Sequence, residues 1–163
     1  MPYTMQVDGM AEISETLTKM ADRAQAVAAQ ALYDGAGIMA DEIKQSAAAI
    51  RTEPFRYAKM GTRLPSPEEK AIVEQASAGI AKFNKNGTEV DTSVGYRNAG
   101  YAMLGNKEKP IPQIVNAINS GTSFMNKQPF VRKAAKSGGT KAINAMKAKI
   151  EEAFDQIIGG KTE

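Results

Sequence analysis

The sequence contains no cysteine and no histidine, and the two absences together remove most catalytic chemistry. Without cysteine the chain has no disulfide framework, no thiolate zinc site and no cysteine nucleophile. Without histidine it lacks the commonest metal ligand and the usual general base at neutral pH. An enzyme would have to use a pair of carboxylates, a lysine, or a serine with a lysine base.

Neither the acidic pairs nor the glycine pairs of the sequence form such an arrangement. Consecutive side chains on a helix diverge by about 100°, so neighbouring carboxylates on expected helices cannot share a proton or a metal ion. This applies to Asp41 and Glu42, Glu68 and Glu69, and Glu151 and Glu152. The run Gly138–Lys141 lacks the spacing of a phosphate-binding loop, and Ser137 with Lys141 is no stronger as a catalytic dyad. The sequence therefore predicts a protein that is not an enzyme and holds no cofactor and no metal.

Tryptophan and long apolar runs are also missing. No stretch approaches the roughly 18 apolar residues needed to cross a bilayer, and the first ten residues carry no run of signal-peptide length. We therefore expect no membrane partner and synthesis in the cytoplasm. The 163 residues, 42% of them hydrophobic and 24% charged, predict one globular domain spanning residues 1–163.

Charge is divided unevenly along the chain, although the formal net charge is only +3. Residues 1–50 carry three basic and seven acidic side chains, whereas residues 109–150 carry eight basic and no acidic ones. The basic segment could meet nucleic acid or an acidic partner subunit, or it could dock on the acidic segment of its own chain. Projected at about 100° per residue, its basic groups spread around the expected helix, which favours a solvated surface. These groups are Lys127, Arg132, Lys133, Lys136, Lys141, Lys147 and Lys149.

The N-terminal third predicts a short strand and then a long helix. Apolar residues alternate with polar ones at Tyr3–Val7, as in a half-buried strand. From Met10 the apolar residues recur in steps of three and four, which predicts one apolar stripe that packs on a sheet of the same chain, or otherwise forms a coiled coil between subunits. Gly35 and Gly37 predict either a kink or a close contact in this helix, and we expect the kink.

The middle of the chain alternates between loops and short elements. Residues 51–64 lack periodicity and predict an exposed basic loop with four basic side chains, those of Arg51, Arg56, Lys59 and Arg63. Ser66 and Glu69 form a capping-box pattern that predicts a short helix ending near Gly79. The dipeptide Asn86-Gly87 predicts the turn of a β-hairpin, and residues 98–109 predict an irregular projection.

The C-terminal third predicts a second long helix. Residues 110–120 form a short amphipathic helix or strand that stops at Gly121, and Pro129 opens the long helix. The pair Gly138-Gly139 predicts a break or tight turn within it. Together these elements predict an α+β fold, in which a small antiparallel sheet with a β-hairpin packs against a long N-terminal and a long C-terminal helix.

One segment carries a specific pattern. A Gly-Thr-Ser turn precedes a Gln-Pro-Phe-Val-Arg run that opens the last helix, formed here by Gly121, Thr122, Ser123, Gln128, Pro129, Phe130, Val131 and Arg132. In this order the segment resembles the signature of the neck and tail-completion proteins of long-tailed double-stranded DNA bacteriophages. The order of the predicted elements is similar over nearly the whole chain. The chain departs from the family pattern at Asn119 and Ser120, where relatives often have an acidic residue before the glycine.

The resemblance implies a structural virion protein that forms a homo-oligomeric ring, expected to have six copies. Such a ring lies at the head–tail junction, joins the head-completion or connector protein to the tail terminator, and surrounds DNA without reading its sequence. It is assembled in the host cytoplasm. On this view Arg51, Arg56, Lys59 and Arg63 of the loop and Asn86 and Gly87 of the hairpin contact neighbouring subunits. The alternatives are a small basic nucleic-acid-binding protein and, third, a small hydrolase or transferase.

Overall fold

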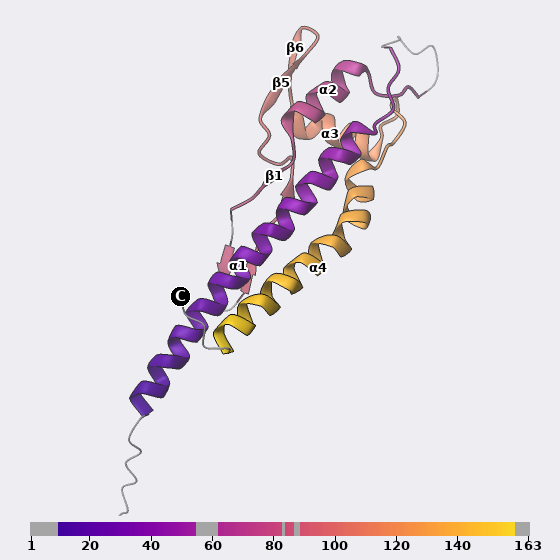
Figure 1. Cartoon of the computed structure of the whole chain (residues 1–163). Coiled ribbons are helices and arrows are strands. Elements are labelled where there is room, and N and C mark those ends of the chain that lie inside the picture. Colours follow the sequence, from indigo (N-terminus) through magenta and orange to yellow (C-terminus); the bar gives the residue numbers. More distant parts are fainter. Residues whose placement is uncertain (1–9, 55–61, 83, 87–88, 159–163) are drawn as a thin grey trace, which may run out of the picture.

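The computed structural model describes residues 10–54, 62–82, 84–86 and 89–158, and it has the predicted α+β fold (Figure 1). The expected strand at residues 3–7 lies outside the described residues, as do Arg56, Lys59 and Gly87. In chain order the elements are α1 (Met10–Ala48), α2 (Pro67–Ala76), β1 (Gly79–Ile80), β2 (Asn84–Asn86), β3 (Glu89–Asp91), β4 (Val94–Gly95), β5 (Tyr101–Leu104), β6 (Lys107–Pro110), α3 (Ile111–Ser120) and α4 (Phe130–Ile158).

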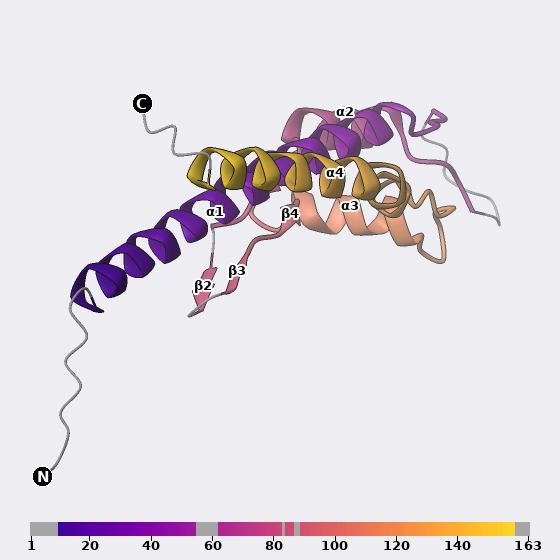
Figure 2. The same ribbon diagram turned by 60° about the horizontal axis from the view of Figure 1, so that its bottom comes forward.

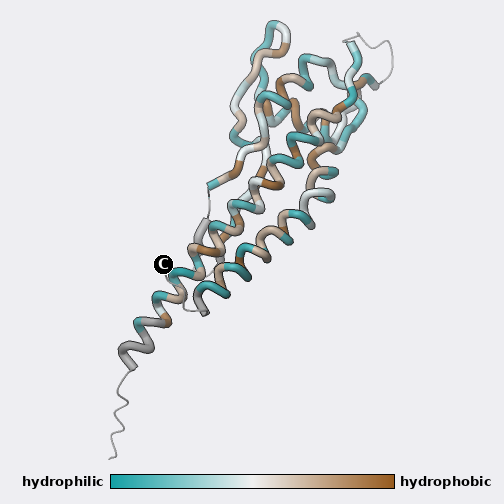
Figure 3. The backbone as a smooth tube through the Cα atoms, in the orientation of Figure 1, coloured by the Kyte–Doolittle hydropathy of each residue, from teal (hydrophilic) through white to brown (hydrophobic). Residues whose placement is uncertain are grey.

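The two long helices lie side by side and run in opposite directions (Figures 1 and 2). The apolar stripe of α1 packs mainly on α4, so the expectation that it packs mainly on a sheet is wrong. Alanine-rich stripes let two helix backbones approach closely, and α4 supplies the matching stripe. Hydrophobic residues recur along both helices with polar residues between them (Figure 3). The first part of α1 extends past the end of α4.

Glycines at this helix contact serve close approach and do not interrupt the helices. Helix α1 is straight along its length (Figure 1), so the kink expected at Gly35 and Gly37 is wrong. Helix α4 continues through Gly138 and Gly139, so the break expected there is also wrong. A Cβ atom on Gly35 would lie 2.8 Å from the side chain of Met146, and one on Gly138 would lie 2.8 Å from that of Glu42. Neither helix has room for a side chain at these two points.

Substitution of the neighbouring glycines by alanine is expected to have opposite effects. Gly139→Ala should raise the free energy of unfolding by about 0.5–1 kcal/mol, because its Cβ would meet no described atom within 4 Å and alanine favours the helix. Gly138→Ala should lower it by about 1–3 kcal/mol, because the new Cβ overlaps with Glu42. Urea unfolding followed by circular dichroism measures both. Changes of the same sign would contradict the close contact at Gly138.

The strands form three separate antiparallel ribbons in place of one sheet. β1 pairs with β4, β2 with β3, and β5 with β6. The predicted β-hairpin is present, but Asn86 does not lie in its turn, because it pairs with Glu89 as the last residue of β2. Residues 98–109 are not irregular, since β5 and β6 form a second hairpin that turns at Gly105, with a φ of 61°, and projects beyond α2 (Figure 1).

The main hydrophobic core lies where the end of α1, α2, α3 and the start of α4 meet. Its most deeply buried side chains include Ile118 of α3 and Val73 of α2. Phe130 is 3% exposed and packs edge to face on Tyr96, with ring centroids 6.2 Å apart. Helix α2 begins with the predicted capping box, in which the Ser66 hydroxyl accepts a hydrogen bond from the Glu69 backbone N–H. The Gln-Pro-Phe-Val-Arg run thus enters the core through Phe130.

Candidate functional site

The motif segment between α3 and α4 is a compact turn held by its own hydrogen bonds. Gly121 ends α3 with a φ of 78° and a ψ of 169°, a conformation that is essentially restricted to glycine. The hydroxyl of Thr122 accepts hydrogen bonds from the backbone N–H groups of Phe124 and Met125, at 3.2 and 3.0 Å. Ser123 is exposed at the surface of this turn. The Gly-Thr-Ser part of the motif therefore forms a turn, as its residue types predict.

The Gln-Pro-Phe part of the motif ties the segment to the loop that follows α1. The side-chain amide of Gln128 binds the backbone of Arg51 in both directions, accepting from its N–H at 2.9 Å and donating to its carbonyl at 2.8 Å. Arg63 and Met125 form a parallel β-bridge. Both ends of the 51–64 loop are therefore bound to the motif segment, a contact between residues 77 positions apart that sequence patterns do not reveal.

The first turn of α4 uses Asn119, one of the positions at which this chain departs from the family pattern. The side-chain oxygen of Asn119 accepts a hydrogen bond from the backbone N–H of Val131 at 3.2 Å, which satisfies one donor at the start of the helix. Pro129 directly precedes α4. Arg132 is exposed and makes no ion pair with a described residue.

Gly121→Ala is expected to lower the free energy of unfolding by about 1–3 kcal/mol. The backbone conformation of Gly121 costs a non-glycine residue this much, and a new Cβ would lie 3.0 Å from the backbone nitrogen of Lys127. Thermal unfolding measures the change. Gly105→Ala is the control, because that glycine also has a positive φ but a Cβ there would meet no described atom within 4 Å. A Gly121→Ala loss no larger than that of the control would argue against crowding at the motif turn.

Of the predicted contact residues in the basic loop, Arg63 is not available for a partner. Its guanidinium binds the carboxylate of Glu69 through two hydrogen bonds, of 2.7 and 2.8 Å, and its side chain is 17% exposed. The hydrogen bonds that Arg63 donates to Glu69 raise the pKa of Arg63 above its ordinary value. Burial raises the pKa of Glu69, but hydrogen bonds from Arg63 and Ser66 outweigh burial and lower it. Arg63 is therefore a structural residue, whereas Arg51 is exposed at the loop's start.

The basic segment and the acidic segment meet within the chain at one cluster. Lys141 of α4 forms an ion pair with Glu42 of α1, and the hydroxyl of Ser137 donates a hydrogen bond to the same carboxylate at 2.9 Å. Lys141 and Ser137 both lower the pKa of Glu42. Ser137 and Lys141 thus act together on a carboxylate across the helix contact beside Gly138. This geometry accounts for their spacing without a catalytic role.

Four other basic residues of α4 point away from α1, and sequence reasoning missed their alignment. Arg132, Lys133, Lys136 and Lys147 are all exposed, and they make no ion pair with a described residue. At 100° per residue they fall within about 100° of one another. The buried residues Ala134, Gly138 and Ala142 lie on the opposite side of the helix. The alignment of these four basic residues becomes visible only when the face of α4 that packs on α1 is known.

Large apolar side chains are exposed at both ends of the molecule. On the part of α1 that extends past α4, Leu17 is 61% and Met20 42% exposed. On the projecting β5–β6 hairpin, Tyr101 is 67% and Met103 58% exposed, and Phe124 beside the motif turn is 71% exposed. Clusters of exposed apolar side chains are typical of interaction surfaces. Sequence periodicity predicted the α1 stripe but not the face of the hairpin.

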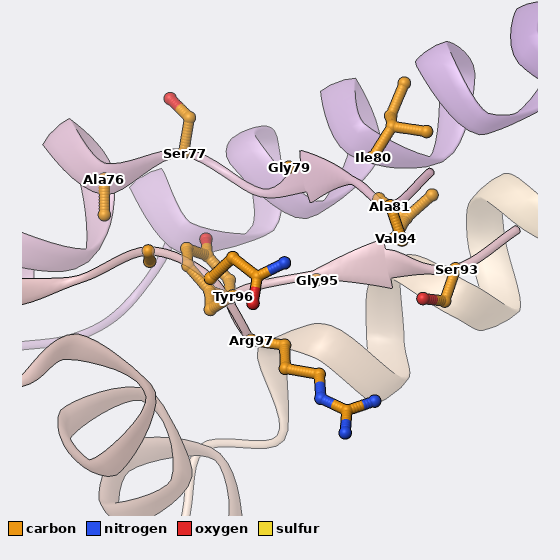
Figure 4. A pocket seen from close by; sticks show the side chains of 12 residues that line it. Ala76, Ser77, Gly79, Ile80, Ala81, Ser93, Val94, Gly95, Tyr96 and Arg97 are labelled. Carbon is orange, nitrogen blue, oxygen red and sulfur yellow. The ribbon is translucent and has the colours of Figure 1, made fainter. Parts of the chain in front are cut away.

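A cavity of about 590 Å³ lies along β1 and β4 (Figure 4). Its polar side chains do not converge, because Ser77 and Arg97 lie on opposite sides of the strand pair. The hydroxyl of Tyr96 is buried without a hydrogen-bond partner among the described residues, and burial raises its pKa to about 12. It faces no solvent. This cavity does not gather the groups that a ligand site needs.

Comparison of the chain with protein-family models, with curated proteins and with solved structures finds no match. Among the described residues, none of the helices combines the length and hydropathy that crossing a membrane requires. The same part of the chain contains no group of three or more acidic side chains placed to hold a metal ion. The motif and the exposed surfaces are therefore the features of this chain that bear on its function.

Proposed function

We propose that this protein is a structural subunit of the neck of a long-tailed double-stranded DNA bacteriophage. Six copies form a ring at the head–tail junction, join the head-completion protein to the tail terminator, and surround the channel for DNA. The observation that carries the proposal is the motif at residues 121–132, which resembles the family signature in residue type and order. Hydrogen bonds of this segment connect the 51–64 loop, α3 and α4, and this supports an architectural role for the motif.

The distribution of exposed apolar residues also supports a role in assembly. A ring subunit contacts its two neighbours through different surfaces, so it needs apolar or charged residues at separate places. Leu17 and Met20 lie on the free end of α1, and Tyr101 and Met103 lie on the hairpin beyond α2. Exposed apolar side chains that lie together are typical of interaction surfaces. Contacts with neighbouring subunits and with the rings above and below would cover them.

Quantitative mass spectrometry of purified phage particles tests this function. The copy number of this chain is measured against the portal ring, which the family resemblance implies is a dodecamer. Half the portal number is the expected result for a sixfold ring. Absence of the chain from particles that carry both head and tail would overturn the proposal, and nucleic-acid binding would then be the leading function.

A second measurement separates ring contacts from folding. Leu17→Ser with Met20→Ser removes apolar surface that is already exposed, so the thermal midpoint of the isolated protein should stay within about 2 °C of the parent. Particles assembled with this variant should be fewer and should lack joined tails, as counted by electron microscopy. Normal numbers of joined particles would show that the free end of α1 makes no contact that assembly needs.

A further inference from the structure

We infer that the outward face of α4 is a binding surface for the phosphate backbone of duplex DNA. The basic stripe of α4 is defined by Arg132, Lys133, Lys136 and Lys147, all exposed and without an ion-pair partner among the described residues. At 1.5 Å per residue the stripe extends over about 22 Å. The inference that the stripe lines the channel rests on the proposed function. The inference that the stripe binds DNA depends only on the placement and charge of these four residues.

The charge pattern of the stripe is unfavourable for a surface that only meets water. Arg132 and Lys136 are four residues apart and Lys133 and Lys136 three, so like charges face one another on the same side of the helix. Such pairs destabilise a helix, and opposite charges are the usual pattern on a solvated face. From Phe130 to Ile150 the helix has no acidic residue. An external polyanion would remove this repulsion.

The chain's own acidic residues do not neutralise the stripe. Glu42 lies at the contact between α1 and α4, where it binds Lys141. The ion pair between Lys149 and Glu152 lies past the end of the stripe. Glu151 is exposed four residues after Lys147, but the two side chains form no ion pair.

The exposed charged residues of α1 include both signs, such as Asp41 and Lys44, so α1 of a second copy offers no strongly acidic face to the stripe. The last turns of α4 carry the exposed acidic residues Glu151, Glu152 and Asp155, whereas a DNA duplex carries about 13 phosphate charges over the length of the stripe. Charge complementarity therefore favours a nucleic-acid backbone over another copy of the chain.

The test is the binding of the full-length protein to two duplexes of unrelated sequence, followed by fluorescence anisotropy over a range of salt concentrations. Four phosphate contacts predict that the logarithm of the association constant falls with the logarithm of salt concentration with a slope of about −3.6. Lys136→Gln with Lys147→Gln removes two contacts and should reduce the slope to about −1.8. Both duplexes should bind equally, because backbone contacts carry no sequence information.

The matched control is Lys107→Gln with Lys109→Gln, which makes the same change in net charge on the β5–β6 hairpin, where both residues are exposed. The control should keep the parent slope. Equal slopes for the two variants, or no binding of the parent at low salt, would overturn the inference. Tighter binding of polyglutamate than of DNA, at equal total charge and equal salt concentration, would assign the stripe to an acidic protein and would also overturn the inference. The copy-number result in particles is independent of each outcome.

Discussion

Phe130→Ala is expected to lower the free energy of unfolding by about 3–5 kcal/mol, and the thermal midpoint by about 6–20 °C. Phe130 is 3% exposed and lies in the main core, so its removal leaves a cavity that rigid helices on several sides cannot fill. The edge-to-face contact with Tyr96 is lost as well. Urea and thermal unfolding of the purified protein measure the effect.

The control for this prediction is Phe124→Ala, in the same motif segment. Phe124 is 71% exposed, so its loss should change the free energy of unfolding by about 0.5 kcal/mol or less. The two variants together separate the role of Phe130 in the core from that of Phe124 at the surface. A small effect of Phe130→Ala would mean that the motif does not anchor α4 in the core, and the architectural role proposed for it would be wrong.

Glu69→Ala is expected to lower the free energy of unfolding by about 3–5 kcal/mol. The carboxylate of Glu69 holds the guanidinium of Arg63 through two hydrogen bonds, and it accepts a third, of 2.8 Å, from the backbone N–H of Ser66. The side chains of Arg63 and Glu69 are only 17% and 7% exposed. Removal of the carboxylate leaves a cation in a partly buried place and opens the capping box.

Glu68→Ala is the neighbouring control. Glu68 is exposed and accepts one hydrogen bond, of 3.1 Å, from the backbone N–H of Gly105, so its loss should cost about 1 kcal/mol or less. Urea midpoints at neutral pH compare the two variants. Similar losses for both would show that the pair of Glu69 and Arg63 contributes little beyond the start of α2.

The same carboxylate predicts a loss of stability in acid. The pKa of Glu69 is lowered in the folded protein, so its contribution is present above the unfolded pKa of 4.5 and is lost as the pH falls through the lower folded value. Glu69→Gln, which keeps the shape of the side chain, should therefore lose less stability than the parent as the pH falls. Glu42, whose pKa is also lowered, accounts for part of the acid dependence that is left. Identical acid profiles for parent and variant would contradict this assignment.

Local patterns in the sequence predicted the elements whose causes are local. The capping box at Ser66 and Glu69, the apolar period of α1, the proline before α4 and the glycine after α3 all depend on residues within one or two turns of each other. The α+β class follows from these elements. The same reasoning failed at Gly35 and Gly138, because a glycine that breaks a helix and a glycine that admits a neighbouring helix look alike in one sequence.

The candidate surfaces were predicted only in part, for a related reason. Four basic residues were expected to be exposed in the loop after α1. Of the two that the structure describes, Arg51 is exposed and Arg63 binds Glu69 inside the fold. The sequence does not reveal the basic stripe on α4. Projecting all the basic residues together mixes those that face solvent with Lys141, which binds Glu42. Whether a charged side chain faces solvent depends on which face of its helix is covered by the rest of the fold.

The sequence by itself determined the absence of cysteine and histidine chemistry, the two long helices, the start of α2, the first β-hairpin, and the motif with its turn and helix start. These properties depend on composition and on neighbours along the chain. Only the tertiary structure decided that α1 packs on α4 at two glycines, that Gln128 binds Arg51 from 77 residues away, and that Arg132, Lys133, Lys136 and Lys147 share one outward face. Such features depend on which surfaces meet when the chain folds, because contacts between distant residues leave no period in the sequence.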